Sequence, residues 1–433
     1  MSSSADRRWP NPRDSAGTES GPSSFVLRCI SCRGEQPPGS QGLVCCTCGG
    51  PLEVFYDYEA LVAGRGGVPV DGSRQGVWRY SPLLPLNLGT RTYSLGEGST
   101  PLVVASSTSE AMNLCRVLVK DESRNPTLSF KDRKSTVAVS KAAEFGATGI
   151  VNMTAGNAGS SVAAYAARAG IPAYIFTIEG ISEAKLAKLL SFGARVFRTS
   201  APTKELMSFV EAVARRYGMV NMTAASRYNP YGKEGAKTSV FEVFEQTGGT
   251  LPDWMLVPVG SGGNLAAIHK GLRELRSLGL VEKLPRLVGV QGRGCAPVVE
   301  AYERGLPPGE IPEIPNPRTI AHSILDSWTP DGDQVLTAIR ETRGLAVGVS
   351  DSEILESMRV LSSKEGLFLE PAAAAPLAAL KKLVEDGRVG RDESALLFAT
   401  GSGSNQPEAT IDAWGRPPEV ALDLEEFARY LPK

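Results

Sequence analysis

The feature that most constrains this chain is a regular alternation of strand-like and helix-like segments that begins near residue 149. Short apolar, β-branched runs alternate with longer segments whose apolar residues recur at helical spacing, which predicts parallel strands joined by helical crossovers. One set of predicted strands lies at residues 150–153, 173–178, 195–198 and 219–222, separated by helices at 162–168, 182–192 and 204–217. A second set lies at residues 254–259, 286–290, 344–349 and 395–399, with helices at 265–275, 351–363 and 372–385. Two α/β units are therefore expected.

A lysine stands at the expected start of a helix upstream of this alternation. Asn125 and Pro126 favour a turn, Ser129 is a candidate N-cap, and Gly146 is placed to end the helix. Lys131 then lies in the first turn, where the electropositive helix end disfavours an ammonium. A neutral amine can form a Schiff base with an aldehyde cofactor. The alternative is an ordinary solvated lysine.

Five of the seven cysteines lie in one short segment. Cys29 and Cys32 form one C-x-x-C pair, and Cys45 and Cys48 form a second pair. Such pairs are typical of a zinc ribbon, in which four thiolates complete a closed tetrahedral shell and the metal has a structural role. Cys46 is then a spare thiol. The alternative is a set of reducible thiols without metal.

A glycine-rich turn joins a predicted strand to a predicted helix. It consists of Gly260, Ser261, Gly262, Gly263 and Asn264. Backbone N–H groups at such a turn can converge on an anion, and the helix dipole adds attraction. The turn is neither a Walker A loop nor a dinucleotide fingerprint. An ordinary tight turn is the alternative.

Two polar side chains lie at other predicted strand ends. Asn157 lies in a loop that leads into a helix, where its amide can bind a phenolic oxygen or cap a turn. Thr400 closes the last predicted strand, where its hydroxyl can face a ring nitrogen or serve as an ordinary strand-end residue. A lysine amine, an asparagine, a phosphate-binding turn and a hydroxyl are together what pyridoxal phosphate requires.

Length and charge restrict the class of protein. The 433 residues suffice for two or more domains with large cores. The net charge is −1, whereas a nucleic-acid or membrane surface would need a basic excess, so neither partner is expected. Residues 1–24 are expected to be a disordered tail, and a cytoplasmic location is expected because no apolar signal core is present. The only histidines, His269 and His322, are expected to be structural.

Six passages give the chain a specific resemblance. They are LGEGSTP (95–101), KDESRNPTLSFKDR (120–133), TAGNAG (154–159), NPYGKEG (229–235), DWMLVPVGSGGN (253–264) and EP (370–371). With them the chain resembles the tryptophan-synthase-β-like (fold-type II) pyridoxal-phosphate enzymes, and within these the threonine-synthase family with an N-terminal cysteine ribbon. The resemblance implies an α/β fold with two doubly wound parallel-sheet domains. They would be a large cofactor domain (59–134 and 236–433) and a small domain (135–235), preceded by a zinc-ribbon-like module (25–58) and the tail. It also implies a homodimer.

The resemblance implies roles for residues. Lys131 would hold the cofactor and then move protons, Asn157 would contact the pyridoxal 3′-oxygen, and Thr400 would contact the ring nitrogen. The 5′-phosphate would be held by Gly260, Ser261, Gly262, Gly263 and Asn264, and a structural zinc by Cys29, Cys32, Cys45 and Cys48. Thr154 and Ser160 would lie near the substrate carboxylate, and Ser99 and Thr100 are candidates for a substrate phosphate. The implied reaction converts O-phosphohomoserine and water to L-threonine and phosphate by elimination and β-addition.

The chain departs from the family pattern at several positions. The family usually has a glycine where Leu128 stands and often another at Lys134, and residues 401–406 and 321–328 differ from the usual sequences. A paralogue that performs β-replacement on O-phosphoserine or a similar activated amino acid, as a cysteate synthase does, is therefore the nearest alternative. A catalytically silent binding protein on the same scaffold is a second. A ribbon that binds nucleic acid is a third, disfavoured by its near-neutral charge.

Overall fold

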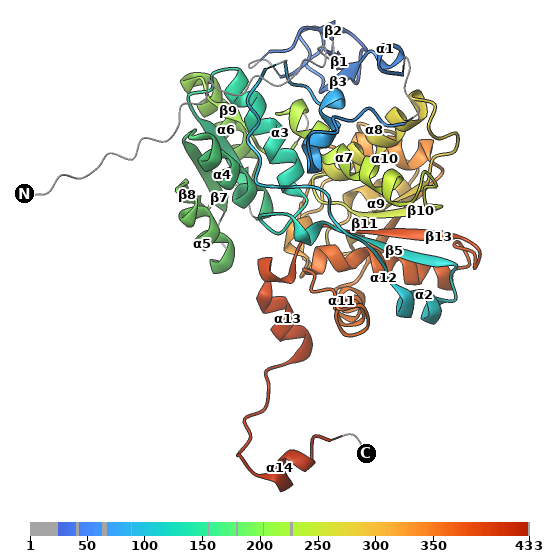
Figure 1. Cartoon of the computed structure of the whole chain (residues 1–433). Coiled ribbons are helices and arrows are strands. Elements are labelled where there is room, and N and C mark those ends of the chain that lie inside the picture. Colours follow the sequence, from blue (N-terminus) through green and yellow to red (C-terminus); the bar gives the residue numbers. More distant parts are fainter. Residues whose placement is uncertain are drawn as a thin grey trace, which may run out of the picture.

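The computed structural model of this protein describes residues 25–431 except 40–42, 63–66, 88, 155, 179–180, 202 and 226–227. The tail predicted at residues 1–24 lies outside the described residues. Three sheets organise the described part of the chain: a small N-terminal sheet, a four-stranded sheet and a six-stranded sheet (Figure 1). No helix among these residues is long and apolar enough to cross a membrane.

The N-terminal sheet is antiparallel, in the order β2-β1-β3. Its strands are β1 (Phe25–Cys29), β2 (Glu35–Gln36) and β3 (Leu52–Tyr56), and the short helix α1 (Tyr58–Val62) follows. Side chains of β3 alternate between buried and half-buried, as expected when one face of a sheet packs against another body. The sheet lies across the top of the molecule in the view of Figure 1.

The four-stranded sheet is parallel throughout, in the order β8-β7-β6-β9. It contains β6 (Ile150–Thr154), β7 (Ala173–Ile178), β8 (Arg195–Thr199) and β9 (Val220–Asn221). The crossovers are α4 (Asn157–Ala169), α5 (Glu183–Ser191) and α6 (Thr203–Tyr217). This arrangement confirms the parallel α/β unit expected from the alternation.

The six-stranded sheet has the order β12-β11-β10-β13-β5-β4. Its strands are β4 (Leu102–Val104), β5 (Arg116–Asp121), β10 (Trp254–Pro258), β11 (Arg286–Gly292), β12 (Leu345–Val349) and β13 (Ser394–Ala399). All neighbours are parallel except the edge strand β4, which runs antiparallel to β5. The link between β4 and β5, with α2 (Ser106–Met112), is too short for a parallel crossover. The expected doubly wound parallel sheet is therefore confirmed, with one antiparallel strand added at its edge.

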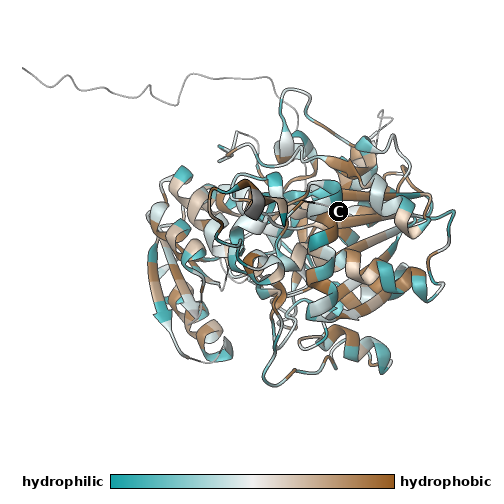
Figure 2. Ribbon diagram, turned by 90° about the horizontal axis from the view of Figure 1, so that it is seen from below, coloured by the Kyte–Doolittle hydropathy of each residue, from teal (hydrophilic) through white to brown (hydrophobic). Residues whose placement is uncertain are grey.

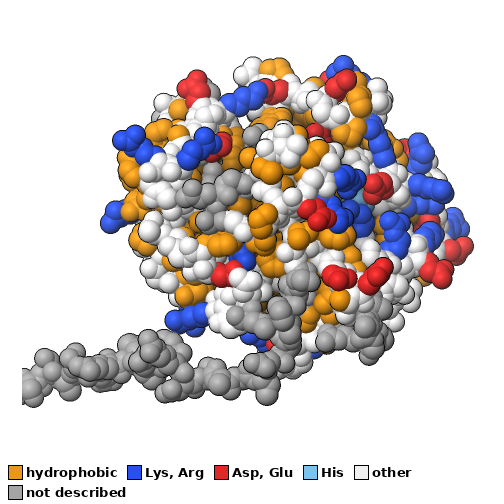
Figure 3. Space-filling model, turned by 90° about the horizontal axis from the view of Figure 1, so that it is seen from above, with side chains coloured by type: hydrophobic (Ala, Val, Ile, Leu, Met, Phe, Trp, Pro, Cys, Tyr) orange, Lys and Arg blue, Asp and Glu red, His pale blue; other side chains and the backbone are white. Residues whose placement is uncertain are grey.

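Helices cover both faces of the six-stranded sheet. They are α7 (Pro230–Gln246), α8 (Gly263–Ser277), α9 (Pro297–Glu303), α10 (Gly332–Glu341), α11 (Asp351–Glu365) and α12 (Pro371–Glu385). All five residues of β10 are buried, which explains why its sequence is continuously apolar rather than alternating. The strands are brown in the hydropathy colouring of Figure 2, while the outer helices carry hydrophilic residues. Acidic and basic side chains are interspersed on the face that Figure 3 shows.

Helix α3 (Lys131–Glu144) links the two larger sheets. It packs on α4 and also on α7. Because β5, β10 and β13 are parallel, their carboxyl ends lie at one edge of the sheet. Ligands of open α/β sheets bind at that edge. Beyond it the chain ends with α13 (Pro407–Trp414) and α14 (Leu424–Ala428), the latter drawn away from the body in Figure 1.

Candidate active site

Lys131 is the first residue of α3, as the sequence predicted, but a different residue caps the helix. The N-cap is Phe130, which has helical backbone angles and no side-chain cap. The hydroxyl of Ser129 is buried and has no hydrogen-bond partner among the described residues. The prediction of a Ser129 N-cap is therefore wrong, because the chain is already helical at the residue after it.

A buried carboxylate, that of Asp132, holds the turn that precedes Lys131. Asp132 accepts hydrogen bonds from the backbone N–H and the hydroxyl of Thr127, both at 2.6 Å. It accepts a third from the hydroxyl of Ser161 on α4, also at 2.6 Å. Burial raises the pKa of Asp132 to about 6, which the three donors oppose. Asp132 thus fixes the orientation of the first turn of α3 against α4.

The amine of Lys131 lies in surroundings that favour its neutral form. Burial lowers the pKa of Lys131 to about 8, and the nearby ammonium of Lys134 acts in the same direction. The carboxylates of Asp326 and Glu370 oppose this shift without cancelling it. The direction agrees with the sequence-based expectation, although burial rather than the helix end is the largest cause.

The end of β13 is hydrogen-bonded directly to the lysine turn. The N–H of Phe130 donates to the carbonyl of Thr400 at 3.0 Å, and the N–H of Ser402 donates to the carbonyl of Leu128 at 3.0 Å. Thr400 is buried, and its hydroxyl has no hydrogen-bond partner among the described residues. The structure therefore brings Lys131 and Thr400 together although the sequence separates them widely.

Asn157 is the first residue of α4 and lies beside a carboxylate that sequence reasoning left without a role. Its amide donates to the two carboxylate oxygens of Glu370 at 2.9 and 3.1 Å. A Cβ at Gly401 would lie 2.7 Å from Glu370 Oε1, so the carboxylate also adjoins the end of β13. Glu370 is 1% exposed and precedes the proline that opens α12. Its place in a matching passage was the only signal that pointed to it.

The loop before α4 is organised by one hydroxyl. Thr154 accepts from the N–H of Gly156 at 3.0 Å and from the N–H of Gly159 at 3.1 Å. The hydroxyl of Ser160, one residue further, is buried and has no partner among the described residues. An unpartnered buried hydroxyl is a usual sign of a group that a ligand satisfies.

The glycine bend follows β10 and opens α8. The N-cap Gly262 has φ +88°, and no side chain caps the helix, so the first N–H groups of α8 remain available to an anion. A Cβ at Gly260 would lie 2.9 Å from Asp326 Oδ2, and one at Gly262 would lie 2.9 Å from Val335. Side chains at these two positions would fill the bend.

The chemistry of these donors fits pyridoxal phosphate. The structure offers a lysine amine of lowered pKa, an uncapped glycine bend for a phosphate, and a strand-end hydroxyl next to the lysine turn. Asp326, whose pKa burial raises to about 6, lies beside the bend and was not foreseen as a site residue. In the sequence, Asp326 is one acidic residue in the irregular segment 305–333, and no local pattern distinguishes it.

The two residues considered for a substrate phosphate lie elsewhere. Thr100 is 2% exposed; its hydroxyl donates to Glu122 at 2.8 Å and accepts from Arg133 at 3.0 Å. The N–H of Ser99 donates to Glu242 at 2.7 Å. Both residues are thus held by the ion network around Arg133, and their role toward a substrate stays a prediction.

That network fixes α3 against α7. Arg133 is fully buried and pairs with Glu122 and Glu242, each at 2.7 Å, while Lys120 pairs with Glu242 at 2.8 Å. Burial of Glu242 opposes its ionisation, but Arg133 and Lys120 outweigh it and hold the pKa of Glu242 at about 2. The two cations and two carboxylates balance, so the network holds the helix that carries Lys131 without a net charge.

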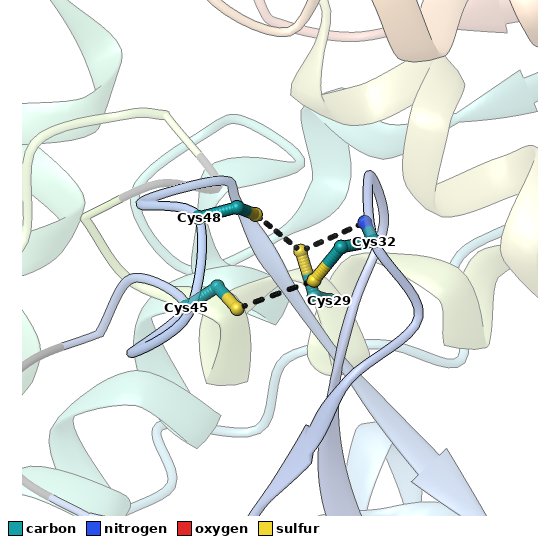
Figure 4. A group of neighbouring side chains, drawn as sticks. All are labelled: Cys29, Cys32, Cys45 and Cys48. Atoms are coloured by element: carbon teal, nitrogen blue, oxygen red, sulfur yellow. Dashed lines mark hydrogen bonds between the residues drawn. The ribbon is translucent and has the colours of Figure 1, made fainter.

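The four predicted zinc ligands converge (Figure 4). Their sulfur atoms all lie within 4.8 Å of one another, and Cys29–Cys48 and Cys32–Cys45 are 3.5 and 3.6 Å apart. The N–H of Cys32 donates to the sulfur of Cys29, as knuckles that hold a thiolate do. Four thiols at this spacing fit a tetrahedral metal.

The ribbon is joined to the body by charged and phenolic groups. The hydroxyl of Tyr56 donates to Glu234 at 2.9 Å, and that of Tyr58 donates to Glu274 at 3.0 Å. Glu53 pairs with Lys233 on α7 at 2.9 Å, and with an arginine of α8. The ribbon therefore packs on the helices next to the site as part of one body.

Comparison with known proteins agrees with this site. The protein-family model described as "Pyridoxal-phosphate dependent enzyme" matches residues 93–401 of this chain. The threonine synthase of Methanocaldococcus jannaschii is 36% identical over 94% of this chain and 99% of its own length. That of Methanosarcina acetivorans is 34% identical over 93% and 97%.

A solved structure shows the same fold. The diaminopropionate ammonia lyase of Escherichia coli superimposes with a TM-score of 0.63 at 18% identity, covering 74% of this chain and 89% of its own. At that identity the likeness concerns the fold alone. The fold is therefore a known architecture.

Proposed function

The chain belongs to the fold-type II pyridoxal-phosphate dependent enzymes and to the threonine-synthase family within them, and on that premise we propose that it converts O-phosphohomoserine and water to L-threonine and phosphate. The similarity to threonine synthases over more than nine-tenths of the chain supports the substrate most strongly, and the Lys131 turn, hydrogen-bonded to the end of β13, supports attachment of the cofactor. A lysine that is about half neutral at pH 8 can hold the cofactor and later accept and return a proton.

The proposed cofactor contacts follow the geometry. Lys131 holds the cofactor, the N–H groups of residues 260–264 bind its phosphate, Asn157 hydrogen-bonds its phenolic oxygen, and Thr400 faces its ring nitrogen. Bound there, the cofactor supplies an electron sink for negative charge at the α-carbon of an amino acid. A neutral hydroxyl at Thr400 leaves the ring nitrogen unprotonated, which moderates that sink and favours elimination over simple reprotonation.

The remaining assignments concern the substrate and the assembly. We propose that the loop organised by Thr154, with the unpartnered hydroxyl of Ser160, binds the substrate carboxylate. Departure of the phosphate and addition of water at the β-carbon complete the reaction. We further propose a structural zinc on Cys29, Cys32, Cys45 and Cys48, a homodimer, and a cytoplasmic location.

Turnover tests the substrate. Purified protein loaded with pyridoxal phosphate is mixed with O-phosphohomoserine, and threonine and phosphate are measured together. We expect both products in equal amounts, and we expect Lys131→Ala to lose them together with the absorbance near 410–420 nm that marks cofactor bound to a lysine. If Lys131→Ala keeps that absorbance, the cofactor is not bound to Lys131.

Two segments near the site favour a second candidate function. The loop 401–406 and the segment 321–328 depart from the usual family sequence, and both adjoin the site through Gly401 and Asp326. The alternative is β-replacement on O-phosphoserine with a nucleophile such as sulfite. Turnover of O-phosphoserine plus sulfite, with none of O-phosphohomoserine, would replace the first proposal with the second.

A further inference from the structure

A second lysine in the site has no role in the chemistry proposed above. Lys134 follows Lys131 by three residues on α3, so the two side chains lie on the same face of the helix. Both line one pocket, whose other walls come from α4 and from the segment between β9 and α7, including Ala158, Met222 and Asn229. Among the described residues that line this pocket there is no carboxylate.

The ammonium of Lys134 is partly enclosed and has no paired anion among the described residues. Within the described part of the chain, Nζ of Lys134 has neither a hydrogen bond nor an ion pair. Burial, the largest cause, lowers the pKa of Lys134, Asp331 acts on it electrostatically in the opposite direction, and Lys233 acts on it as a like charge. A cation withdrawn from water without a directly paired anion is costly. The cost is offset if an anion enters with a ligand.

The neighbouring helix makes room for this side chain. A Cβ at Gly232 on α7 would lie 2.7 Å from Cγ and 3.0 Å from Cε of Lys134. The stem of Lys134 therefore occupies the space that any other residue at position 232 would fill. Gly232 is not in the left-handed region, so its lack of a side chain serves this close approach rather than its own backbone conformation.

We infer that Lys134, with Lys131 beside it, forms the subsite that receives the phosphate group of the amino-acid substrate. The inference rests on the proposed function, in which three anionic groups must be bound: the cofactor phosphate, the substrate carboxylate and the substrate phosphate. The glycine bend of α8 serves the cofactor phosphate, and none of its residues lines the pocket of Lys134. The start of α4 serves the substrate carboxylate. The substrate phosphate is the anion without an assigned place, and Lys134 lines a pocket beside Lys131; a lysine is a suitable point charge for a phosphate.

Binding of inorganic phosphate to the cofactor-loaded enzyme tests the subsite without turnover. We expect calorimetry to show that Lys134→Met weakens phosphate binding at least about tenfold, which is about 1.4 kcal/mol. Lys134→Arg should stay within about threefold of the original protein, because it keeps the charge. Lys364→Met, which removes an exposed lysine on α11, is the matched control and should bind phosphate unchanged.

A second variant guards against misfolding of the first. Gly232→Ala keeps both lysines but places a methyl group against the stem of Lys134, and it should weaken phosphate binding in the same direction. In turnover, Lys134→Met should raise KM for the phosphorylated substrate at least about tenfold and leave inhibition by unphosphorylated L-homoserine unchanged.

Three results would overturn the subsite, and each is distinct from failure of the proposed function. If the original protein and Lys134→Met bind phosphate with equal affinity, the inferred subsite is refuted, even if the enzyme makes threonine. If Lys134→Met weakens inhibition by L-homoserine as much as it weakens phosphate binding, Lys134 contacts the substrate carboxylate instead. Loss of pyridoxal phosphate from Lys134→Met would assign it to the cofactor. If O-phosphohomoserine is not turned over at all, the calorimetric comparison still decides whether Lys134 binds phosphate.

Discussion

The titration of Lys131 follows directly from its surroundings. With a pKa of about 8, about a quarter of the Lys131 amines are neutral at pH 7.5, against about 0.1% for a lysine at the ordinary pKa of about 10.4. Reagents that need a neutral amine should therefore attack Lys131 about two hundred times more readily than its ordinary pKa would allow. The reactivity should rise with pH and level off above about pH 9.

Removing the neighbouring charge should move this titration. Lys134 is the second cause of the lowered pKa, after burial. Two like charges about 4 Å apart repel with about 1 kcal/mol in water and about 4 kcal/mol at an effective dielectric constant of about 20, and about 1.4 kcal/mol corresponds to one pKa unit. Because Lys134 disfavours the protonated form of Lys131, Lys134→Met should raise the pKa of Lys131 toward 9.

Competitive acetylation of the cofactor-free protein with acetic anhydride, read by mass spectrometry, measures this pKa. Lys364, exposed on α11, serves as an internal standard in the same sample. A midpoint near 10.4 for Lys131 would refute the argument from burial. An unchanged or lower midpoint in Lys134→Met would show that the two ammonium groups do not interact.

Further predictions concern stability and the metal. Glu242→Gln leaves buried Arg133 underpaired and should lower the free energy of unfolding, measured in urea at pH 7, by about 3–5 kcal/mol. An unchanged free energy of unfolding would show that this ion network does not stabilise α3. Since the pKa of Glu242 is lowered to about 2, its contribution is present above the ordinary carboxylate range and is lost as pH falls toward 2, which unfolding curves against pH can follow. Leu128→Gly should raise the unfolding free energy by about 1 kcal/mol, because Leu128 has φ +69°; a decrease would mean that its side-chain packing outweighs the strain. Elemental analysis should find one zinc per chain, lost in Cys45→Ser and retained in Cys46→Ser; loss in both would contradict the ligand set.

Periodic elements were predictable, and elements built on close backbone approach were not. The strand predicted at 173–178 has those bounds in β7. Helix α7, in contrast, begins at Pro230 after an Asn229 cap, where the apolar pattern predicts no helix. Its first half has no apolar periodicity because small residues let it approach α3: a Cβ at Gly235 would lie 1.7 Å from the carbonyl oxygen of Arg133. Such packing leaves glycines in the sequence rather than an amphipathic pattern.

Site residues were predictable where a single local element places them. Lys131 begins a helix, the glycine bend joins a strand to a helix, and the cysteine pairs form knuckles. Thr100 shows the limit, because its hydroxyl is held by Glu122 and Arg133, and no local pattern reveals an ion network assembled from three distant segments. Glu370 and Lys134 likewise gain their positions only from the packing of separate helices.

Two of the positions at which this chain departs from the family pattern are in direct contact, which changes how they should be interpreted. The carbonyl of Leu128 accepts from the N–H of Ser402 and from the amide of Asn405, both at 3.0 Å, so the unusual turn and the unusual loop after β13 are hydrogen-bonded to each other. Lys134 in turn depends on the space at Gly232. Residues in direct contact have non-additive effects, so restoring a family residue at one member of a pair would disturb the other. Double-mutant cycles at 128 with 405 and at 134 with 232 measure how strongly the members of each pair are coupled.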